Sequence, residues 1–167
     1  MSELSPTGGS EGYGTCGDDI AKRENYVDYI ANRPRVQKLG AHGLFTADDG
    51  PLVLSQVADE VARHPGVVWL PIISLRREDA ARLGYDSAES WRSLLTRQMP
   101  EMAKAMKIPL DQLRWYAAFH DEGNHPHVHM VCYSVDGKSG FLSRRYLPCW
   151  VRIPVSSTTR PIRPEKK

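Results

Sequence analysis

Histidines gather in one short part of this 167-residue chain. Four of the six lie within ten residues, namely His120, His125, His127 and His129. Neutral imidazole is a common ligand of divalent transition metals, so this segment is the first candidate for a chemical site. The other two histidines, His42 and His64, stand apart in the sequence and are interpreted as structural or exposed.

The residues around the cluster predict a β-hairpin. Two segments rich in β-branched and aromatic side chains flank a turn-forming loop: 113–120 and 126–134. Side chains alternate along a strand, so His127 and His129 point to one face. If the loop consists of residues 121–126, His120 stands directly opposite His127 and shares that face. A register slip of one residue would send His120 to the other face, so the site depends on the loop length.

Three convergent imidazoles predict a metal site. A set of three nitrogen ligands suits Zn, Mn, Ni or Cu better than Mg, and it leaves positions open for water or substrate. Asp121 and Glu122 supply carboxylates that are candidates to support the ligating rings. His125 is out of phase with the strand and is interpreted as a bystander or a substrate contact. The alternative interpretation is a surface hairpin that happens to be rich in histidine.

Further elements are expected to surround this hairpin. The helical period of apolar side chains predicts helices at 22–33, between Pro51 and Pro65, at 77–83 and after Ser87. Pro100 is expected to kink or restart the last helix. Residues 67–75 predict a buried strand in which Pro71 indicates a bulge or an edge. Because helices and strands alternate around at least one hairpin, the predicted fold class is an α+β sandwich.

The composition limits the class of protein. The chain is 41% hydrophobic and 25% charged, which is typical of one globular domain and excludes a wholly disordered chain or a coiled coil. No apolar run approaches the roughly 20 residues of a membrane span, and the N-terminus lacks the apolar core of a signal peptide. Cys16, Cys132 and Cys149 are too scattered for a disulfide framework or a zinc motif. A cytoplasmic protein with reduced thiols is therefore expected.

Charge is distributed unevenly along the chain, whose net charge is +2. Residues 144–167 hold seven lysines and arginines against Glu165 alone. The predicted organisation is a flexible leader at 1–20, a core at 21–142 and a basic, proline-rich tail at 143–167 that is disordered or divergent. A basic tail on a mildly acidic body indicates a polyanionic partner, and the alternative is a solvated tail without one.

Several motifs together resemble one family. The histidine motif of HUH relaxases, the DNA-nicking enzymes of plasmid mobilisation, resembles AFHDEGNHPHVHMVCYS. The nucleophile-bearing N-terminal motif of the MobP group resembles NYVDYIANRPRV. This chain is also similar to the MobL-like relaxases of Gram-positive bacteria and their integrative elements. That similarity covers three stretches: HGLF, VWLPIISLRREDAARLGYDSAESWRSLL and LRWYAAFH. The resemblance covers about residues 22–142.

The resemblance implies an antiparallel sheet flanked by helices, with the histidines on the central strands. It also implies site- and strand-specific nicking of single-stranded DNA at an origin of transfer by tyrosine transesterification. Carried over residue by residue, Tyr29 is the nucleophile with Tyr26 as its rival, and His120, His127 and His129 hold the metal. The implied cofactor is a divalent ion, Mg or Mn first, with Zn, Ni or Cu as alternatives in vitro. Other mobilisation or coupling proteins are the implied protein partners, and membrane insertion is not expected.

The resemblance ends near residue 142. The family continues into helices that cover the sheet and clasp DNA, whereas residues 143–167 are rich in proline and lack a helical period. We therefore expect a truncated or frame-shifted product, or a fragment. Cationic and aromatic side chains of the tail are candidates for weak single-strand binding: Arg144, Arg145, Arg152, Tyr146 and Trp150.

Three other functions stay open. An inactive relaxase remnant would bind metal or DNA without turnover. A rolling-circle replication initiator shares the histidine motif and a tyrosine nucleophile, but usually carries the tyrosine after the histidines, where Tyr133 and Tyr146 lie outside any recognisable helical motif. A metal-dependent hydrolase would use the three histidines and a water, and would need no tyrosine.

Overall fold

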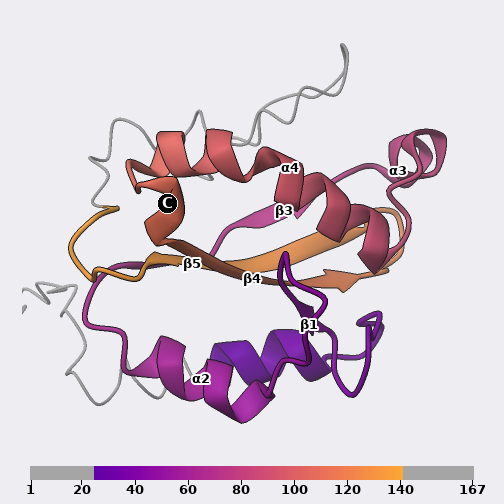
Figure 1. Cartoon of the computed structure of the whole chain (residues 1–167). Coiled ribbons are helices and arrows are strands. Elements are labelled where there is room, and N and C mark those ends of the chain that lie inside the picture. Colours follow the sequence, from indigo (N-terminus) through magenta and orange to yellow (C-terminus); the bar gives the residue numbers. More distant parts are fainter. Residues whose placement is uncertain (1–24, 141–167) are drawn as a thin grey trace, which may run out of the picture.

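The computed structural model of the chain describes residues 25–140 as helices on both faces of one sheet (Figure 1). In chain order the elements are a helix over 25–32, β1 (Leu44–Phe45), α2 (Leu54–Ala62), β2 (Val68–Trp69), β3 (Ile72–Ser74), α3 (Arg77–Leu83), α4 (Ala88–Met106), a 3₁₀ turn (Leu110–Gln112), β4 (Leu113–His120) and β5 (His127–Ser134). In Figure 1, α4 lies on one side of the sheet, and α2 and helix 25–32 lie on the other. This arrangement confirms the predicted α+β class.

The sheet is antiparallel and is centred on the hairpin of β4 and β5. These strands pair over their full length, from Leu113 opposite Ser134 to His120 opposite His127. β1 pairs with the outer side of β4, whereas β2 and β3 both pair with β5. The hairpin therefore forms the middle of the sheet, and the histidines lie on its two central strands, as the resemblance implied.

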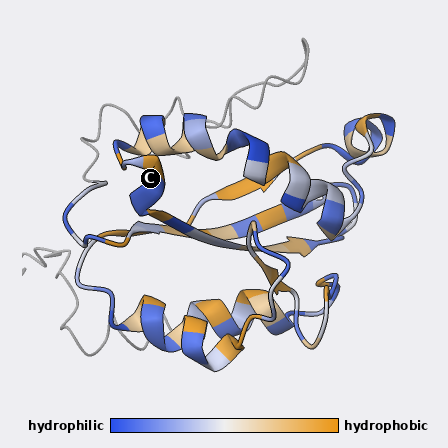
Figure 2. Ribbon diagram, in the orientation of Figure 1, coloured by the Kyte–Doolittle hydropathy of each residue, from blue (hydrophilic) through white to orange (hydrophobic). Residues whose placement is uncertain are grey.

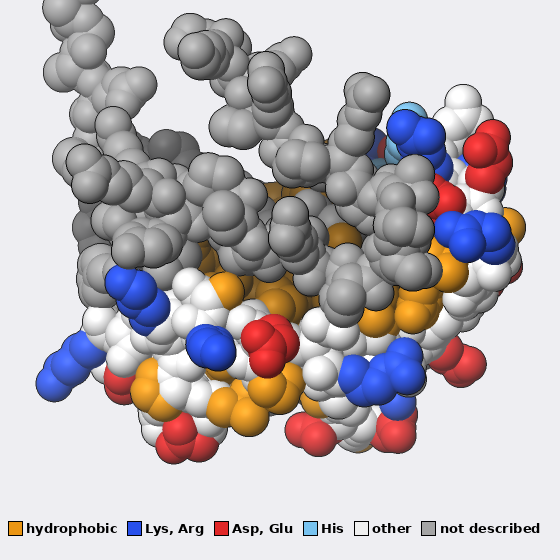
Figure 3. Space-filling model, turned by 90° about the horizontal axis from the view of Figure 1, so that it is seen from above, with side chains coloured by type: hydrophobic (Ala, Val, Ile, Leu, Met, Phe, Trp, Pro, Cys, Tyr) orange, Lys and Arg blue, Asp and Glu red, His pale blue; other side chains and the backbone are white. Residues whose placement is uncertain are grey.

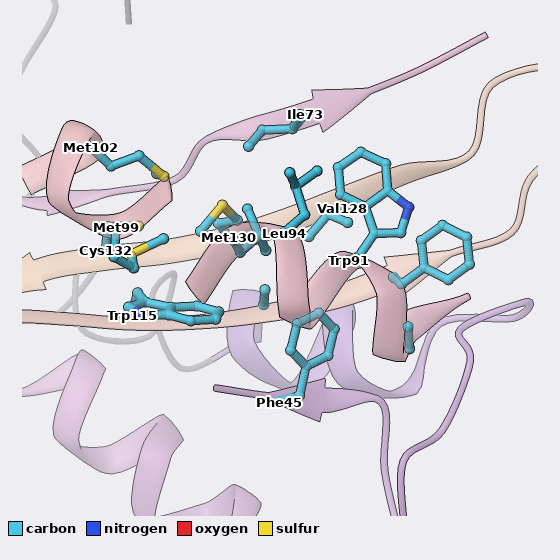
Figure 4. Packing of buried hydrophobic residues seen from close by; sticks show 14 of the residues in the cluster. Phe45, Ile73, Trp91, Leu94, Met99, Met102, Trp115, Val128, Met130 and Cys132 are labelled. Atoms are coloured by element: carbon cyan, nitrogen blue, oxygen red, sulfur yellow. The ribbon is translucent and has the colours of Figure 1, made fainter. Parts of the chain in front are cut away.

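Alternate side chains of the hairpin enter two separate apolar cores. One face packs against α4, where Trp91 and Leu94 lie near Val128 and Met130 of β5 (Figure 4). The opposite face packs against helix 25–32 and α2, and its buried residues are Val27, Ile30, Ala31, Leu44, Val57, Ala58, Val61, Tyr116, Ala118, Val131 and Tyr133. Hydrophobic and hydrophilic residues alternate along the helices, as expected for helices that bury one side (Figure 2). By strand alternation, the three histidines belong to the face under helix 25–32.

Local sequence signals set the ends of α3 and α4. α3 stops at Gly84, whose φ of 75° glycine adopts without strain. α4 begins after Ser87, whose side chain accepts a hydrogen bond from the main-chain N–H of Ser90. The sequence predicts a kink or a restart at Pro100, and the restart is wrong because α4 continues through the proline as one helix. Buried methionines on both sides of the proline hold the helix on the sheet, which offsets the lost hydrogen bond.

The segment predicted as one buried strand at 67–75 forms two short strands instead. Leu70 and Pro71 separate β2 from β3, and proline has no N–H to donate to a sheet. Both strands lie at the edge of the described sheet, and Leu70 and Ile72 remain 43% and 51% exposed. The predicted bulge or edge is confirmed, whereas the burial of the whole segment is wrong.

Several expectations fall outside the described residues. They concern the leader 1–20, the tail 143–167, and Cys16, Cys149, Arg144, Arg145, Tyr146, Trp150 and Arg152. Cys132 is described, and it is a buried free thiol, as expected. His42 is structural, because Leu44 N donates to its Nδ1 and its Nε2 lies 2.9 Å from Leu52 O. Among residues 25–140, no helix is long and apolar enough to cross a membrane.

Candidate metal centre

The ends of β4 and β5 bring three histidines together. His120 closes β4, and His127 and His129 open β5 on the same face. Their ring centroids lie 5.3, 4.8 and 5.0 Å apart. One possible ligand atom from each ring lies within 4.8 Å of the others. The predicted loop and register are confirmed, and with them the prediction that three imidazoles converge.

The chain that follows helix 25–32 fixes the end of β4. Val36 forms an antiparallel bridge with His120. Gly43 N donates to the carbonyl oxygen of Ala31 at 3.0 Å, and a Cβ at Gly43 would collide with the side chain of Val36. A glycine is therefore required where this chain passes close to the helix, and the close approach holds the helix beside the histidines.

Main-chain carbonyls determine which nitrogen of two rings carries the hydrogen. His120 is fully buried, and its Nε2 lies 2.8 Å from the carbonyl oxygen of Ile30. A carbonyl oxygen can only accept, so Nε2 carries the hydrogen and Nδ1 keeps a lone pair. His127 donates from Nδ1 to the carbonyl oxygen of His125 at 2.9 Å, which leaves the lone pair on Nε2. The side chain of His125 itself is exposed.

A tyrosine hydroxyl holds the third ring. Nδ1 of His129 lies 3.2 Å from Oη of Tyr26. Nε2 of His129 and Nδ1 of His120 are buried and have no hydrogen-bond partner among the described residues. Burial, and after it the neighbouring His120 and His127, lowers the pKa of His129 to about 4. Burial also lowers the pKa of His120, so both rings are neutral near pH 7 and keep their lone pairs.

Unpartnered nitrogens in a buried cluster point to a ligand. Buried polar atoms nearly always have a partner, and leaving one without a partner costs about 1–3 kcal/mol. Two such atoms lie in this one cluster, and the third ring adds a lone pair beside them. Three imidazole nitrogen donors fit a divalent transition ion. The residues present therefore fit the metal that the sequence predicts, while the bound ion stays a prediction.

The two carboxylates of the loop pair with arginines rather than with the histidine rings. Asp121 pairs with Arg77 at 2.6 Å, and Glu122 pairs with Arg33 at 3.0 Å. The expectation that these carboxylates support the ligating rings is therefore wrong. Main-chain carbonyls and the Tyr26 hydroxyl take that place, and the guanidinium groups attract the carboxylates through charge-assisted hydrogen bonds.

Helix 25–32 carries two tyrosines in different surroundings. Tyr26 lies against His129, and burial, followed by the nearby Tyr29, raises the pKa of Tyr26 to about 12. Tyr29 follows one turn later and is 50% exposed. The guanidinium of Arg33 covers its ring, with Cζ 5.4 Å from the ring centroid. The structure thus brings Tyr26 to the histidines and leaves Tyr29 exposed, and the choice of nucleophile stays a prediction.

Sequence reasoning missed the contacts that tie helix 25–32 to the hairpin. They join Tyr26 to His129, Ile30 to His120, and Arg33 to Glu122. The available signal is the spacing of Tyr26, Ile30 and Arg33, which recur three or four residues apart and so share one side of a helix. That spacing predicts a common side, but it does not tell which part of the sheet the side meets.

The fold and the site define an α+β protein whose central hairpin carries a candidate metal centre beside a tyrosine-bearing helix. Among models of protein families, that of the MobL relaxases matches residues 17–144, which is more than half of the chain. The chain therefore belongs to the MobL relaxase family, whose members nick DNA during mobilisation. Comparisons with curated proteins and with solved structures found no match.

Proposed function

We propose that this chain nicks single-stranded DNA at an origin of transfer, with the chemistry of the MobP group, through a tyrosine and a histidine-bound divalent ion. The observation that carries the proposal is the convergence of three imidazoles, two of them with a buried unpartnered nitrogen, beside a helix with two tyrosines. Membership of the MobL relaxase family supports the same reaction class.

His120, His127 and His129 would hold the ion through the nitrogens that keep lone pairs. A bound divalent ion supplies positive charge for the non-bridging oxygens of the scissile phosphate, where negative charge develops. Because an imidazole that coordinates an ion carries no charge, such ligands leave the charge of the ion undiminished. The resemblance implies Mg or Mn first, and three nitrogen donors suit Mn better than Mg, so Mn is the first ion to test.

Tyr29 is the proposed nucleophile. Its Oη attacks phosphorus, an Oη–P bond forms and the P–O3′ bond breaks. The phenolic proton leaves Tyr29, the departing 3′ oxygen takes up a proton, and the products are a 3′-hydroxyl strand and a 5′-phosphotyrosine. The covalent link conserves the bond energy for rejoining. Exposure supports this role, because a DNA strand has to reach the hydroxyl, and half of Tyr29 is open to solvent.

Tyr26 is the proposed positioning residue for His129. Its hydroxyl lies at Nδ1, whereas the unpartnered Nε2 is on the other side of the same imidazole ring. A hydroxyl at Nδ1 can accept the Nδ1–H hydrogen, which keeps the lone pair on Nε2. This geometry favours Tyr26 as support for a ligand over Tyr26 as the attacking group.

A nicking assay tests the proposal. Single-stranded oligonucleotides that tile the DNA element carrying the gene are incubated with the full chain and Mn²⁺, and covalent adducts are mapped by peptide mass spectrometry. We expect an adduct on Tyr29 that Tyr29→Phe abolishes and Tyr26→Phe only reduces, with Tyr85→Phe as the matched control. An adduct on Tyr26 would overturn the assignment of the nucleophile.

The same assay separates the other functions. Cleavage without an adduct, unaffected by Tyr29→Phe, would indicate a metal-dependent hydrolase. Metal binding without cleavage or adduct would indicate an inactive remnant. A rolling-circle initiator that used Tyr133 is disfavoured, because that side chain is 1% exposed and its hydroxyl donates to Glu60 at 2.6 Å.

A further inference from the structure

Two arginine–carboxylate pairs hold the loop between β4 and β5, and they use their donors differently. Arg77, at the start of α3, pairs with Asp121 at 2.6 Å. Its Nε and Nη2 also donate to the carbonyl oxygen of Gly123 at 2.9 and 2.7 Å. Two nitrogens of Arg77 therefore donate to atoms of the loop, and this arrangement indicates a structural role.

Arg33 forms the second pair with fewer contacts. One nitrogen, Nη2, lies 3.0 Å from Oε1 and 3.3 Å from Oε2 of Glu122. For its Nε and Nη1, the structure gives no hydrogen bond within residues 25–140. Both side chains of the pair are 29% exposed, so they are partly shielded from water while still open to a ligand. Nε and Nη1 of Arg33 are therefore available to donate hydrogen bonds to a ligand.

The Arg33–Glu122 pair borders the histidine cluster and Tyr29. The guanidinium covers the Tyr29 ring, with Cζ 5.4 Å from its centroid. The charges of Arg33 and Glu122 also act on the neighbouring rings, since Arg33 lowers the pKa of His129 and Glu122 raises it. Figure 3 shows a histidine beside basic and acidic side chains at one end of the molecule. The pair thus lies near both the proposed nucleophile and the proposed metal ligands.

We propose that Arg33 binds the phosphate that Tyr29 attacks, and that the Glu122 carboxylate occupies the position of that phosphate until DNA arrives. The inference rests on the proposed function and adds a substrate-binding residue to it. A carboxylate and a phosphate offer the same feature to a guanidinium, namely two oxygens that accept parallel hydrogen bonds. DNA binding then exchanges one anion for another at Arg33, so the arginine never lies unpaired.

The exchange gives Glu122 an effect opposite in sign to that of Arg33. Arg33 attracts the phosphate, and losing it removes a charge-assisted contact. Glu122 competes for Arg33 and repels the incoming phosphate, so losing its charge removes both obstacles. A pair with a purely structural role would behave differently, because neutralising either partner would then affect the loop and would not strengthen DNA binding.

The test measures binding of the full chain to a fluorescein-labelled oligo-dT strand by fluorescence anisotropy in the presence of Mn²⁺. We expect Glu122→Gln to bind about threefold more tightly, in line with a partly exposed ion pair. Arg33→Gln should bind about tenfold more weakly, since a hydrogen bond between charged groups is lost. Arg33→Lys keeps the charge without the fork and should lie between Arg33→Gln and the wild type.

The Arg77–Asp121 pair supplies matched controls. Asp121→Asn and Arg77→Gln likewise neutralise a loop carboxylate and its arginine partner, and each should alter the dissociation constant less than twofold. Equal effects of Glu122→Gln and Asp121→Asn, or of Arg33→Gln and Arg77→Gln, would overturn the proposal. Thermal melts of all variants report folding, and Glu122→Gln stays decisive even if Arg33→Gln unfolds.

Failure of this inference is distinguishable from failure of the proposed function. If the predicted changes in DNA binding occur and no adduct forms on Tyr29, the phosphate site stands and the nucleophile assignment falls. If the adduct forms on Tyr29 and both Arg33 variants bind oligo-dT as the wild type does, the reaction stands and the phosphate site falls.

Discussion

The sheet face under helix 25–32 and α2 buries polar side chains at two places, which differ in whether the buried polar atoms have hydrogen-bond partners. Further along the hairpin from the histidines, Tyr116 and Tyr133 are 4% and 1% exposed. Both hydroxyls donate to the Glu60 carboxylate of α2, at 3.3 and 2.6 Å. At the histidine end, two buried ring nitrogens have no partner within residues 25–140. The described residues therefore supply a hydrogen-bond acceptor for both tyrosine hydroxyls and no partner for the two histidine nitrogens.

The difference separates a structural role from a ligand-binding one. Glu60 joins α2 to both strands of the hairpin through the two hydroxyls. Burial, and after it Glu60, raises the pKa of Tyr133 and of Tyr116, so the hydroxyls stay protonated and act as donors. Proteins seldom leave buried polar atoms unpartnered without a functional reason. We therefore expect the tyrosine end to govern stability and the histidine end to govern metal binding.

Removing two histidines should have the largest effect. The double change His127→Ala and His129→Ala deletes two of three proposed ligands, and we expect Mn²⁺ affinity to fall by roughly 10³-fold or more. Isothermal titration calorimetry with the full chain measures it, and the wild type should bind one ion. Tyr133→Phe, at the other end of the same face, should bind Mn²⁺ as the wild type does. Equal binding by the double variant would refute the ligand assignment.

Acid should destabilise the metal-free chain through the histidine end. Burial lowers the pKa of His129 to about 4, so between its unfolded value of about 6.5 and 4 the unfolded chain binds the extra proton. The stability contributed by neutral His129 is present above pH 6.5 and is lost as pH falls toward 4, by up to about 3 kcal/mol. Urea unfolding in EDTA at several pH values measures the loss.

A matched variant isolates that effect from other titrating groups. His129→Gln removes the ionisable ring, and its unfolding free energy should fall less steeply between pH 6.5 and 4 than that of the wild type. Parallel curves for the two proteins would show that His129 does not carry the pH dependence.

Removing a hydroxyl at the tyrosine end should cost stability without changing metal affinity. Tyr133→Phe deletes the shorter hydrogen bond to Glu60, and a bond to a charged acceptor contributes about 1.5–3 kcal/mol. We expect a loss near the lower bound, because Glu60 is exposed and water can replace the hydroxyl. Tyr116→Phe should cost less, since its bond is longer at 3.3 Å. Chemical denaturation measures both. A change in Mn²⁺ affinity in either variant would break the separation between the two ends.

The last prediction concerns Tyr26. Tyr26→Phe removes the hydroxyl beside Nδ1 of His129, and loss of such a supporting group typically lowers metal affinity by about 10-fold or more. Tyr29→Phe, one turn further along the same helix, is the control and should leave Mn²⁺ affinity unchanged. If the two variants bind Mn²⁺ equally, Tyr26 does not position the ligand.

The hairpin could be predicted from the sequence because its signals are local. The loop length and the alternation along the strands determine that His120 faces His127 and that His129 shares their side. Gly84 and Ser87 likewise mark helix ends through their own backbone and side-chain preferences. These features depend on residues that are close together in the chain, which is why short patterns were sufficient.

The features that could not be predicted from the sequence depend on contacts between distant segments. Tyr26 and His129 are 103 positions apart, and only the packing of helix 25–32 on the sheet brings them together. Glu122 pairs with Arg33 rather than with a histidine ring because the same packing brings Arg33 to the loop. Burial of α4 on the sheet allowed Pro100 to remain inside a continuous helix. Each outcome is decided by tertiary packing, which overrides the local preference.

The central claim is that the unpartnered histidine nitrogens are metal ligands. Its most direct test is anomalous diffraction at the manganese edge from crystals of the full chain grown with Mn²⁺. The account predicts one strong anomalous peak among Nδ1 of His120, Nε2 of His127 and Nε2 of His129, and none at Glu60. Absence of a peak among the three rings at saturating Mn²⁺, or an equally strong peak at Glu60, would contradict it.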